Sequence, residues 1–245
     1  MLKPNQGVSA GVSSTDEPAP VALFRAHMPK IDLLSSLPKS KRDVQARFSD
    51  KSPEVIALSK QFGKEYFDGS RAYGYGGYRY DGRWLPVARN MIRHFELEPG
   101  MRVLDVGCAK GFLVKDFMLA CPGLEAFGLD ISEYALRHSP EELTGRLHLG
   151  SAVSLPFPDS SFDAVISLNT LHNLERPDVV RAVREIERVS RGKSFIQVDA
   201  YETQAQRALF LDWVLTAAFH DYPDQWINLF EEAGYTGDYF WTILE

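Results

Sequence analysis

One ten-residue stretch near the middle of the chain constrains the fold more than any other. Residues 103–112 read Val-Leu-Asp-Val-Gly-Cys-Ala-Lys-Gly-Phe, an apolar run that ends in an acid and leads into two glycines. The run has the composition of a buried strand, and glycine tolerates the backbone angles of a tight turn that other residues avoid. We therefore expect a strand, a turn and a helix, with a ligand close to the main chain of the turn.

The spacing of the glycines indicates which ligand this turn binds. A dinucleotide fingerprint has the form Gly-x-Gly-x-x-Gly, and counted from Gly107 its other glycines fall on Ala109 and Phe112, which is a poor fit. The segment Asp105 to Gly111 instead resembles motif I of the class I S-adenosylmethionine-dependent methyltransferases, usually Asp-x-Gly-x-Gly-x-Gly, with Ala109 in place of one glycine. The resemblance implies S-adenosylmethionine as the cofactor.

A second motif supports the same family. Residues 150–163 resemble its Gly-Asp-Ala-x-x-Leu-Pro-Phe-x-Asp-x-Ser-Phe-Asp pattern, and from Trp84 to about Tyr235 the resemblance is nearly continuous. The chain departs from the family at Ser151, where an aspartate usually accepts from the adenine amino group. A serine hydroxyl or a backbone group would have to make that contact here.

Composition favours a small-molecule acceptor. The formal net charge of -6 argues against tight binding to nucleic acid or to an anionic membrane, since both depend on basic surface. Residues 169–172, Asn-Thr-Leu-His, stand where nucleic-acid methyltransferases have an Asn/Asp-Pro-Pro-Tyr/Phe motif. We expect a small-molecule substrate, with no nucleic acid and no membrane as partner.

Cysteine usage and hydropathy predict the compartment. The two cysteines, Cys108 and Cys121, form neither a disulfide framework nor a Cys-x-x-Cys metal pattern. No run approaches the roughly 18 apolar residues of a membrane span, and the N-terminus lacks a secretory pattern. The expectation is a cytoplasmic protein without a metal.

Three regions are expected along the chain. Residues 1–20 have the composition of a flexible tail, residues 21–84 form an N-terminal arm with a helix and a Gly/Tyr-rich segment, and residues 85–245 form the methyltransferase domain, with a helical insertion at about 202–222. The Gly/Tyr segment, 73–84, is either a lid over the site or a surface turn. A basic patch at Lys39, Lys41, Arg42 and Arg47 fits a surface-wrapping arm better than an anion site.

The expected fold is α/β, a Rossmann-like doubly wound, mostly parallel sheet of six or seven strands with helices on both faces and an N-terminal helical extension. The expected strands cover residues 101–106, 125–129, 146–149, 162–168, 194–199 and 239–244. The expected helices cover residues 52–66, 86–96, 112–121, 132–138, 177–190, 203–219 and 226–233. The family usually has a seventh strand, so either the sheet is shorter here or an earlier segment supplies it.

Asp130 is the clearest candidate for cofactor binding. It ends the second expected strand, 25 residues beyond Asp105, where an acid can accept hydrogen bonds from both ribose hydroxyls of an adenosine. Ile131 beside it is expected to pack on the adenine. With these two, the predicted cofactor site comprises Asp105, Gly107, Cys108, Ala109, Gly111, Ser151, Ala152 and Asn169.

His172 and Asp199 are the candidates for general-base chemistry. His172 follows the fourth strand and either faces the transferred methyl group or only shapes the pocket, since one histidine without a second member of a catalytic pair is a weak signal. The predicted substrate-side residues are Tyr75, Tyr78, Arg83, His172, Asn173, Tyr201, His220 and Tyr222.

The family resemblance implies in-line methyl transfer to an N or O nucleophile. Tyrosine faces in the Gly/Tyr segment are expected to attract the cationic sulfur or a cationic amine. The alternative is a regulatory or scaffolding protein that binds the cofactor without methyl transfer.

Overall fold

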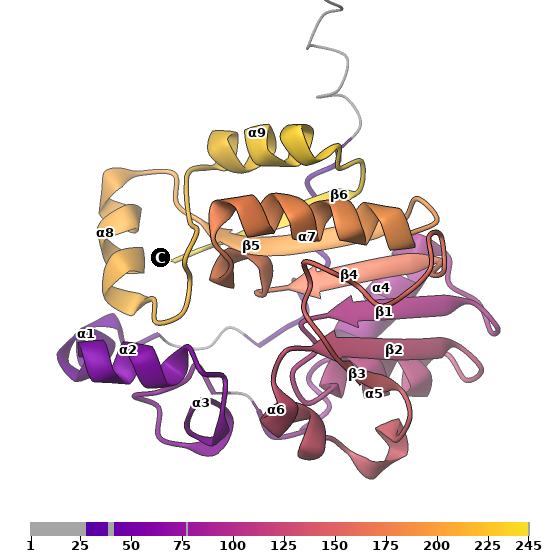
Figure 1. Ribbon diagram of the computed structural model, residues 1–245, viewed down its shortest axis with the longest axis horizontal. Helices are drawn as coiled ribbons and strands as arrows, with labels where there is room; N and C mark the ends of the chain where they lie inside the picture. Colours follow the sequence, from indigo (N-terminus) through magenta and orange to yellow (C-terminus); the bar gives the residue numbers. More distant parts are fainter. Residues whose placement is uncertain (1–27, 39–41, 77, 245) are drawn as a thin grey trace, which may run out of the picture.

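A computed structural model describes residues 28–38, 42–76 and 78–244, so the predicted tail and the lysines of the basic patch lie outside the described residues. Its centre is a parallel six-stranded sheet in the order β3-β2-β1-β4-β5-β6 (Figure 1). The strands are β1 Arg102–Val106, β2 Glu125–Asp130, β3 Leu147–Leu149, β4 Ala164–Leu168, β5 Ser194–Ala200 and β6 Asp238–Ile243. The doubly wound Rossmann-like fold is thereby confirmed.

The apolar strands lie at the centre of the sheet, as their composition predicts. In β1 and β4 nearly every residue is buried, because helices cover both faces of a parallel sheet. The chain runs outward from β1 to β3, then crosses back so that β4 pairs with the other side of β1. The strand order therefore reverses between β1 and β4, which is where open α/β sheets bind ligands.

Two pairs of long helices cover the sheet (Figure 1). The helices α4 Leu85–Phe95 and α5 Phe112–Ala120 pack together on one face, and α7 Arg176–Val189 and α9 Pro223–Ala233 pack together on the other. Each pair buries its apolar stripe in a separate core cluster. The short helix α6 Glu133–Arg137, capped by Ser132, and the 3-10 turns η2 Glu141–Leu143 and η3 Leu171–Asn173 complete the domain.

The remaining helices lie beyond the carboxyl ends of the strands (Figure 1). They are α1 Val44–Asp50, α2 Pro53–Ser59, α3 Lys64–Asp68 and α8 Gln204–Trp213. The single helix expected over residues 52–66 is wrong, although Ser52 caps α2 as predicted. The chain turns at Phe62, whose φ is 48°, and the Ser132 hydroxyl donates to the Phe62 carbonyl. That tertiary bond holds the turn that separates α2 from α3.

The helix expected over residues 203–219 is shorter than predicted. It ends at Trp213, and Val214 is extended. The amides beyond it donate to tertiary partners: Leu215 to the Tyr75 hydroxyl, and both Ala218 and Phe219 to the His172 carbonyl. These contacts replace intrahelical hydrogen bonds that the local pattern predicted.

A segment from the N-terminal arm lies on the outer edge of β6. The Ile31 amide donates to the Tyr239 carbonyl, and the Tyr239 amide donates to the Pro29 carbonyl. The sheet therefore has six strands, and an earlier segment occupies part of the edge where a seventh strand was considered. No helix in the described ranges is both long and apolar enough to cross a membrane.

Candidate functional site

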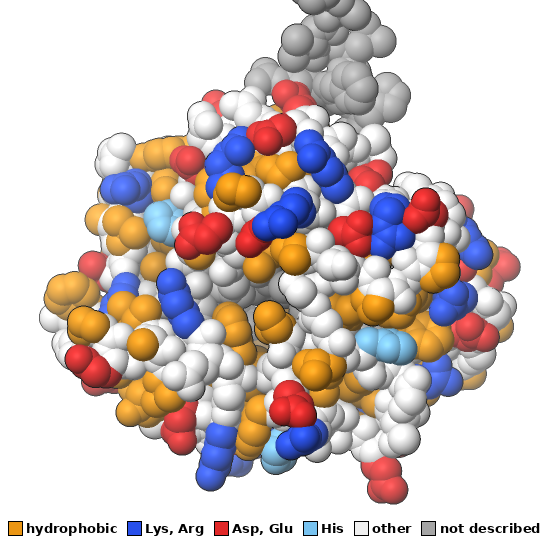
Figure 2. All heavy atoms as spheres, viewed as in Figure 1, with side chains coloured by type: hydrophobic (Ala, Val, Ile, Leu, Met, Phe, Trp, Pro, Cys, Tyr) orange, Lys and Arg blue, Asp and Glu red, His pale blue; other side chains and the backbone are white. Residues whose placement is uncertain are grey.

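A cavity of about 1500 Å³ opens beyond the carboxyl ends of β1, β2, β4 and β5. Figure 2 shows the hollow in the face of the molecule, between the sheet and the helices beyond it. Most of the predicted site residues line it: Tyr75, Tyr78, Arg83, Asp105, Gly107, Cys108, Ala109, Asp130, Ile131, Ser151, Ala152, Asn169, His172, Asn173 and Asp199. The cavity thus unites segments from the arm, the sheet and both motifs.

The turn after β1 has the backbone that its glycines predict. Gly107 has a φ of 85°, and a Cβ there would lie 2.0 Å from Oγ1 of Thr170. Gly111 has a φ of 76°, and a Cβ there would meet Leu143 at 2.6 Å. Ala109 also has a left-handed φ of 51°, which is unfavourable for a residue with a Cβ. Alanine therefore adopts here a backbone conformation that glycine adopts more readily.

Asp130 holds this turn in place. Its Oδ2 accepts from the Ala109 amide at 2.7 Å and its Oδ1 from the Ser132 amide at 2.7 Å. Burial raises the pKa of the carboxyl, and these amide hydrogen bonds oppose the rise. Each carboxylate oxygen keeps a lone pair for a further donor in the cavity.

Asp105 is an unusually weak acid for an aspartate. The side chain is only 5% exposed. Burial, with a smaller contribution from the charge of Asp130, raises its pKa to about 7. Two neighbouring carboxylates thus give the inner part of the cavity a negative potential that favours a cationic ligand group.

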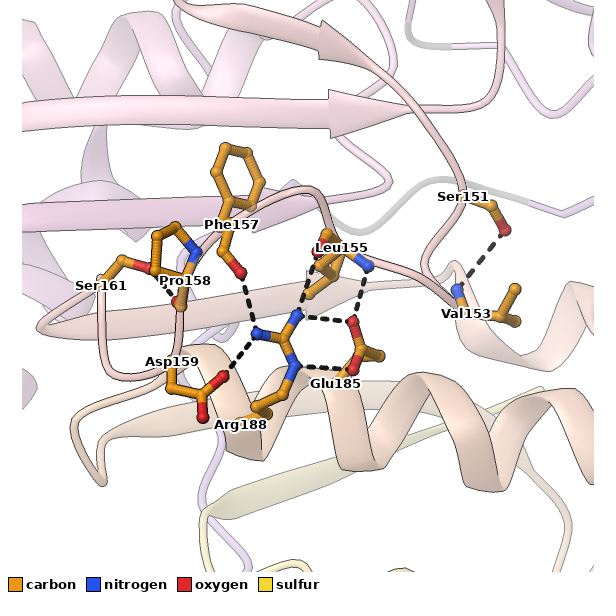
Figure 3. Close-up of polar contacts among 9 residues, drawn as sticks. All are labelled: Ser151, Val153, Leu155, Phe157, Pro158, Asp159, Ser161, Glu185 and Arg188. Carbon is orange, nitrogen blue, oxygen red and sulfur yellow. Dashed lines mark hydrogen bonds and ion pairs between the residues drawn. The ribbon is translucent and has the colours of Figure 1, made fainter.

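The second motif is fixed by a guanidinium on α7 (Figure 3). Arg188 donates twice to Glu185 at 2.7 Å, to the carbonyls of Leu155 and Phe157, and to Asp159. Glu185 in turn accepts from the Leu155 amide. Ser151 lies at the open end of this loop, where its hydroxyl accepts only a long bond of 3.4 Å from the Val153 amide. The hydroxyl can therefore turn toward a ligand.

Lys110 is a residue of the glycine turn that sequence reasoning missed. Its ammonium is buried and contacts both oxygens of Asp68 in α3, at 2.7 and 2.8 Å. The Tyr134 hydroxyl also donates to Asp68. The N-terminal arm is thereby joined to the turn by a partly buried ion pair. The position of Lys110 between the glycines was the only signal in the sequence.

His172 and Asp199 lie side by side, as a base and its partner would. Nδ1 of His172 lies 3.6 Å from the Asp199 carboxylate and accepts from the Asp199 amide at 3.3 Å. Burial lowers the pKa of the imidazole, and Asp199 opposes that shift. Asn173, next in η3, has a buried Oδ1 without a hydrogen-bond partner among the described residues. A neutral imidazole that accepts at Nδ1 carries its proton on Nε2.

Tyr75 joins the Gly/Tyr segment to the chain beyond α8. Its hydroxyl accepts from the Leu215 amide at 2.7 Å, and its ring lies 5.9 Å from that of Trp213. Tyr78 packs against Tyr66 and Phe67 of α3. Trp213 lines the cavity too, but no local pattern marked it as a site residue.

Some predicted substrate-side residues lie elsewhere. Tyr201, His220 and Tyr222 do not line the cavity; they pack together, with the Tyr201 hydroxyl 3.2 Å from Nδ1 of His220. Arg83 lines the cavity, but its guanidinium pairs with Asp81. The cavity therefore unites the predicted residues at the strand ends. It does not include the predicted residues that follow β5.

The sheet order and the cavity at the point of strand reversal define a Rossmann-like α/β protein with a site built on the turn after β1. Residues 104–198 match a family model described as Methyltransferase domain, and this match, together with the fold and the two motifs, supports a class I S-adenosylmethionine-dependent methyltransferase. S-adenosylmethionine is accordingly its cofactor.

Curated relatives that are similar to the chain are named as methyltransferases, and a solved structure shares the fold. The chain is 29% identical over 192 residues to the demethylmenaquinone methyltransferase of Symbiobacterium thermophilum, covering 63% of this chain and 76% of that protein. It is 29% identical over 138 residues to the 2-methyl-6-phytyl-1,4-hydroquinone methyltransferase of Synechocystis, covering 53% of this chain and 41% of that one. The YcgJ protein of Bacillus subtilis shares the fold, with a TM-score of 0.50 and 23% identity over 62% of this chain and 68% of that chain.

Proposed function

We propose that this protein transfers a methyl group from S-adenosylmethionine to an N or O nucleophile of a small-molecule acceptor. The observation that carries the proposal is the shared cavity, in which the glycine turn and Asp130 lie on one side and His172 with Asp199 on another. A candidate adenosine site and a candidate proton acceptor thus line the same cavity.

The residues present fit the cofactor. The turn leaves no room for a Cβ at Gly107, Asp130 has lone pairs for ribose hydroxyls, and Asn173 offers a buried Oδ1 that lacks a partner among the described residues. In this proposal Ile131, which is exposed in the cavity, covers the adenine, and Ser151 or Ala152 contacts its edge. In this proposal Asp105, Cys108, Ala109 and Asn169 surround the methionine end, whereas Gly111 does not line the cavity and packs against Leu143 and Leu147.

The cofactor supplies a methyl group already activated on a positively charged sulfur. The protein therefore contributes mainly alignment, which lowers such barriers by about 7 to 11 kcal/mol. The Asp199 carboxylate is the group placed to take a proton from an oxygen or nitrogen acceptor. His172, whose Nδ1 accepts from the Asp199 amide, orients that segment and presents Nε2 as a donor.

The acceptor in this proposal is largely apolar or aromatic. Aromatic side chains line the cavity beyond the cofactor side: Tyr75, Trp84, Phe210, Trp213, Phe240 and Trp241. The relatives are named for a menaquinone precursor and a hydroquinone, both of which carry aromatic or quinone rings. Rings of this kind suit the cavity wall of this chain.

Binding and turnover test the proposal separately. Calorimetry with S-adenosylhomocysteine should give a dissociation constant that rises about a hundredfold in Asp130→Ala, since a charge-assisted bidentate contact is lost. A screen of metabolite pools for methyl incorporation from labelled cofactor then identifies the acceptor. Binding without transfer to any pool would support a regulatory protein instead.

A His172→Gln variant tests the division of roles. We expect S-adenosylhomocysteine affinity to stay within about twofold and turnover to fall, because the histidine acts through Asp199. Loss of cofactor affinity in this variant would contradict that assignment. Asp199→Asn should lower turnover more for an alcohol or phenol than for an amine that binds unprotonated.

A further inference from the structure

Two aromatic residues from distant parts of the chain form one wall of the cavity. Tyr75 from the Gly/Tyr segment and Trp213 from the end of α8 both line it, and we call this pair the aromatic wall. Their ring centroids are 5.9 Å apart, with a tilt of 39°. We assign the wall to the acceptor side because neither ring belongs to the glycine turn or to a strand end.

A buried arginine lies behind this wall. Arg47 of α1 is 4% exposed, and its guanidinium donates to the carbonyls of Ala72 and Gly74 at 2.8 Å. Its Cζ lies 5.5 Å from the Tyr75 ring centroid and 5.0 Å from that of Trp213. The π electrons of both rings are thus already engaged by a cation. A second cation on the cavity side would be repelled by the first.

Two further arginines extend the positive charge to the cavity itself. Arg42 and Arg71 line it, and Cζ of Arg42 lies 6.0 Å from the Trp213 ring. Within the described ranges, none of these three arginines has a carboxylate at ion-pair distance. Figure 2 shows Lys and Arg side chains at the margin of the hollow.

Other charges on the cavity offset this group only in part. Asp43 lines the cavity and stays charged while its carboxylate accepts from the Ala46 amide as the cap of α1, so it offsets one of the three arginines. Lys30 and Asp32 have opposite charges, and Arg83 pairs with Asp81. The acids Asp105, Asp130 and Asp199 belong to the inner part, where Lys110 is paired with Asp68. The cavity therefore has a negative inner part and a positive outer part.

We propose that the acceptor is an anion, with an apolar or aromatic body against the aromatic wall and its negative group at Arg42 and Arg71. This inference rests on the proposed function and specifies the charge of its acceptor. A chain of net charge -6 repels anions at long range, so the local group of guanidiniums selects them at the site. Protonated amines are disfavoured at the aromatic wall, in contrast to the cationic amine expected from the tyrosines.

Three ring-matched probes test the charge preference directly. The full chain is saturated with S-adenosylhomocysteine, and 1-naphthoate, 1-naphthamide and 1-naphthylmethylammonium are titrated by calorimetry. We expect naphthoate to bind about tenfold tighter than the ammonium compound, with the amide between them. Raising NaCl from about 50 to about 300 mM should shrink the difference, since the two arginines are exposed.

Substitutions assign the preference to the named residues. The double variant Arg42→Gln with Arg71→Gln should lose most of the preference for naphthoate and keep its S-adenosylhomocysteine affinity. Arg137→Gln, an exposed residue paired with Glu133 on α6, is the matched control and should change neither. Arg47 is left intact because its burial makes misfolding the expected result.

The outcomes separate this proposal from the proposed function. Equal affinity for the three probes, tighter binding of the ammonium compound, no binding of naphthoate, or an unchanged preference in the double variant would each overturn the anionic acceptor. If S-adenosylhomocysteine fails to bind the wild type, the methyltransferase proposal fails first. Cofactor binding with no anion preference removes only the present inference.

Discussion

The two parts of the cavity are built in different ways. The proposed cofactor side consists mainly of backbone turns and strand ends within residues 105–173, held by hydrogen bonds such as that from the Ala109 amide to Asp130. The acceptor side consists of side chains from segments more than a hundred residues apart, such as Tyr75 and Trp213. The first can serve one shared cofactor in many proteins, and the second can change its acceptor by substitution of a few side chains.

The largest effect is expected on the cofactor side, at Arg188. Arg188→Met removes the hydrogen bonds that fix the second motif and leaves buried carbonyl groups without a donor. We expect the free energy of unfolding to fall by about 2 to 3 kcal/mol. Chemical denaturation measures this loss, and Arg181→Met, an exposed arginine paired with Asp178 on the same helix, should change it little. A loss no larger than that of the control would show that the loop is held by its apolar residues.

The next effect concerns pH and Asp105. A raised carboxyl pKa means that the folded protein holds a proton which the unfolded chain has released, so the free energy of unfolding falls as pH rises from about 4 to 7. The ammonium of the cofactor's methionine end, which S-adenosylhomocysteine keeps, favours the ionised carboxylate, so cofactor affinity should rise about tenfold from about pH 6 to about pH 8. Calorimetry of S-adenosylhomocysteine across this range measures the effect. A pH-independent affinity, or the same slope in Asp105→Asn, would contradict it.

A smaller loss is expected on the acceptor side. Tyr75→Phe leaves the Leu215 and Thr216 amides without their acceptor and should lower the free energy of unfolding by about 1 to 1.5 kcal/mol. Hydrogen exchange should show faster exchange at those amides, while S-adenosylhomocysteine affinity stays unchanged. Tyr73→Phe in the same segment is the control. A change in cofactor affinity would mean that the two sides are coupled more closely than proposed.

The smallest effect on the free energy of unfolding is expected in the glycine turn. Ala109→Gly removes a Cβ from a left-handed residue and should raise the free energy of unfolding by less than about 1 kcal/mol, because glycine also gains entropy in the unfolded chain. Ala126→Gly in β2, at a regular buried strand position, should lower it. Thermal unfolding of the two variants distinguishes the effects. Destabilisation by Ala109→Gly would show that the methyl group packs favourably.

The same contrast explains what the sequence could predict. Strand runs, the glycine spacing and the acid at position 130 are local signals, and the fold that they predict is confirmed. The break at Phe62 and the early end of α8 depend on hydrogen bonds to Ser132, Tyr75 and His172, which lie far away in the sequence. Tertiary contacts of this kind override helix propensity and leave no periodic pattern.

The site residues follow the same rule. Asp130 could be placed because strand ends share one edge of a parallel sheet, whereas Arg47 and Trp213 meet only through the packing of α1 on α8. Lys110 was overlooked because its partner, Asp68, lies in the arm. The residues proposed to bind the cofactor are therefore easier to place from the sequence than those proposed to select the acceptor.

The short pairing of Pro29 and Ile31 with Tyr239 has a consequence for self-association. An outer strand with free amides and carbonyls can add a strand from another molecule and so begin aggregation. Here the arm takes two of those hydrogen bonds on β6 and places Pro29, which has no amide hydrogen to donate, at the edge. The arm that places Arg47 behind the aromatic wall thus also protects the edge of β6 at Tyr239 from pairing with another molecule.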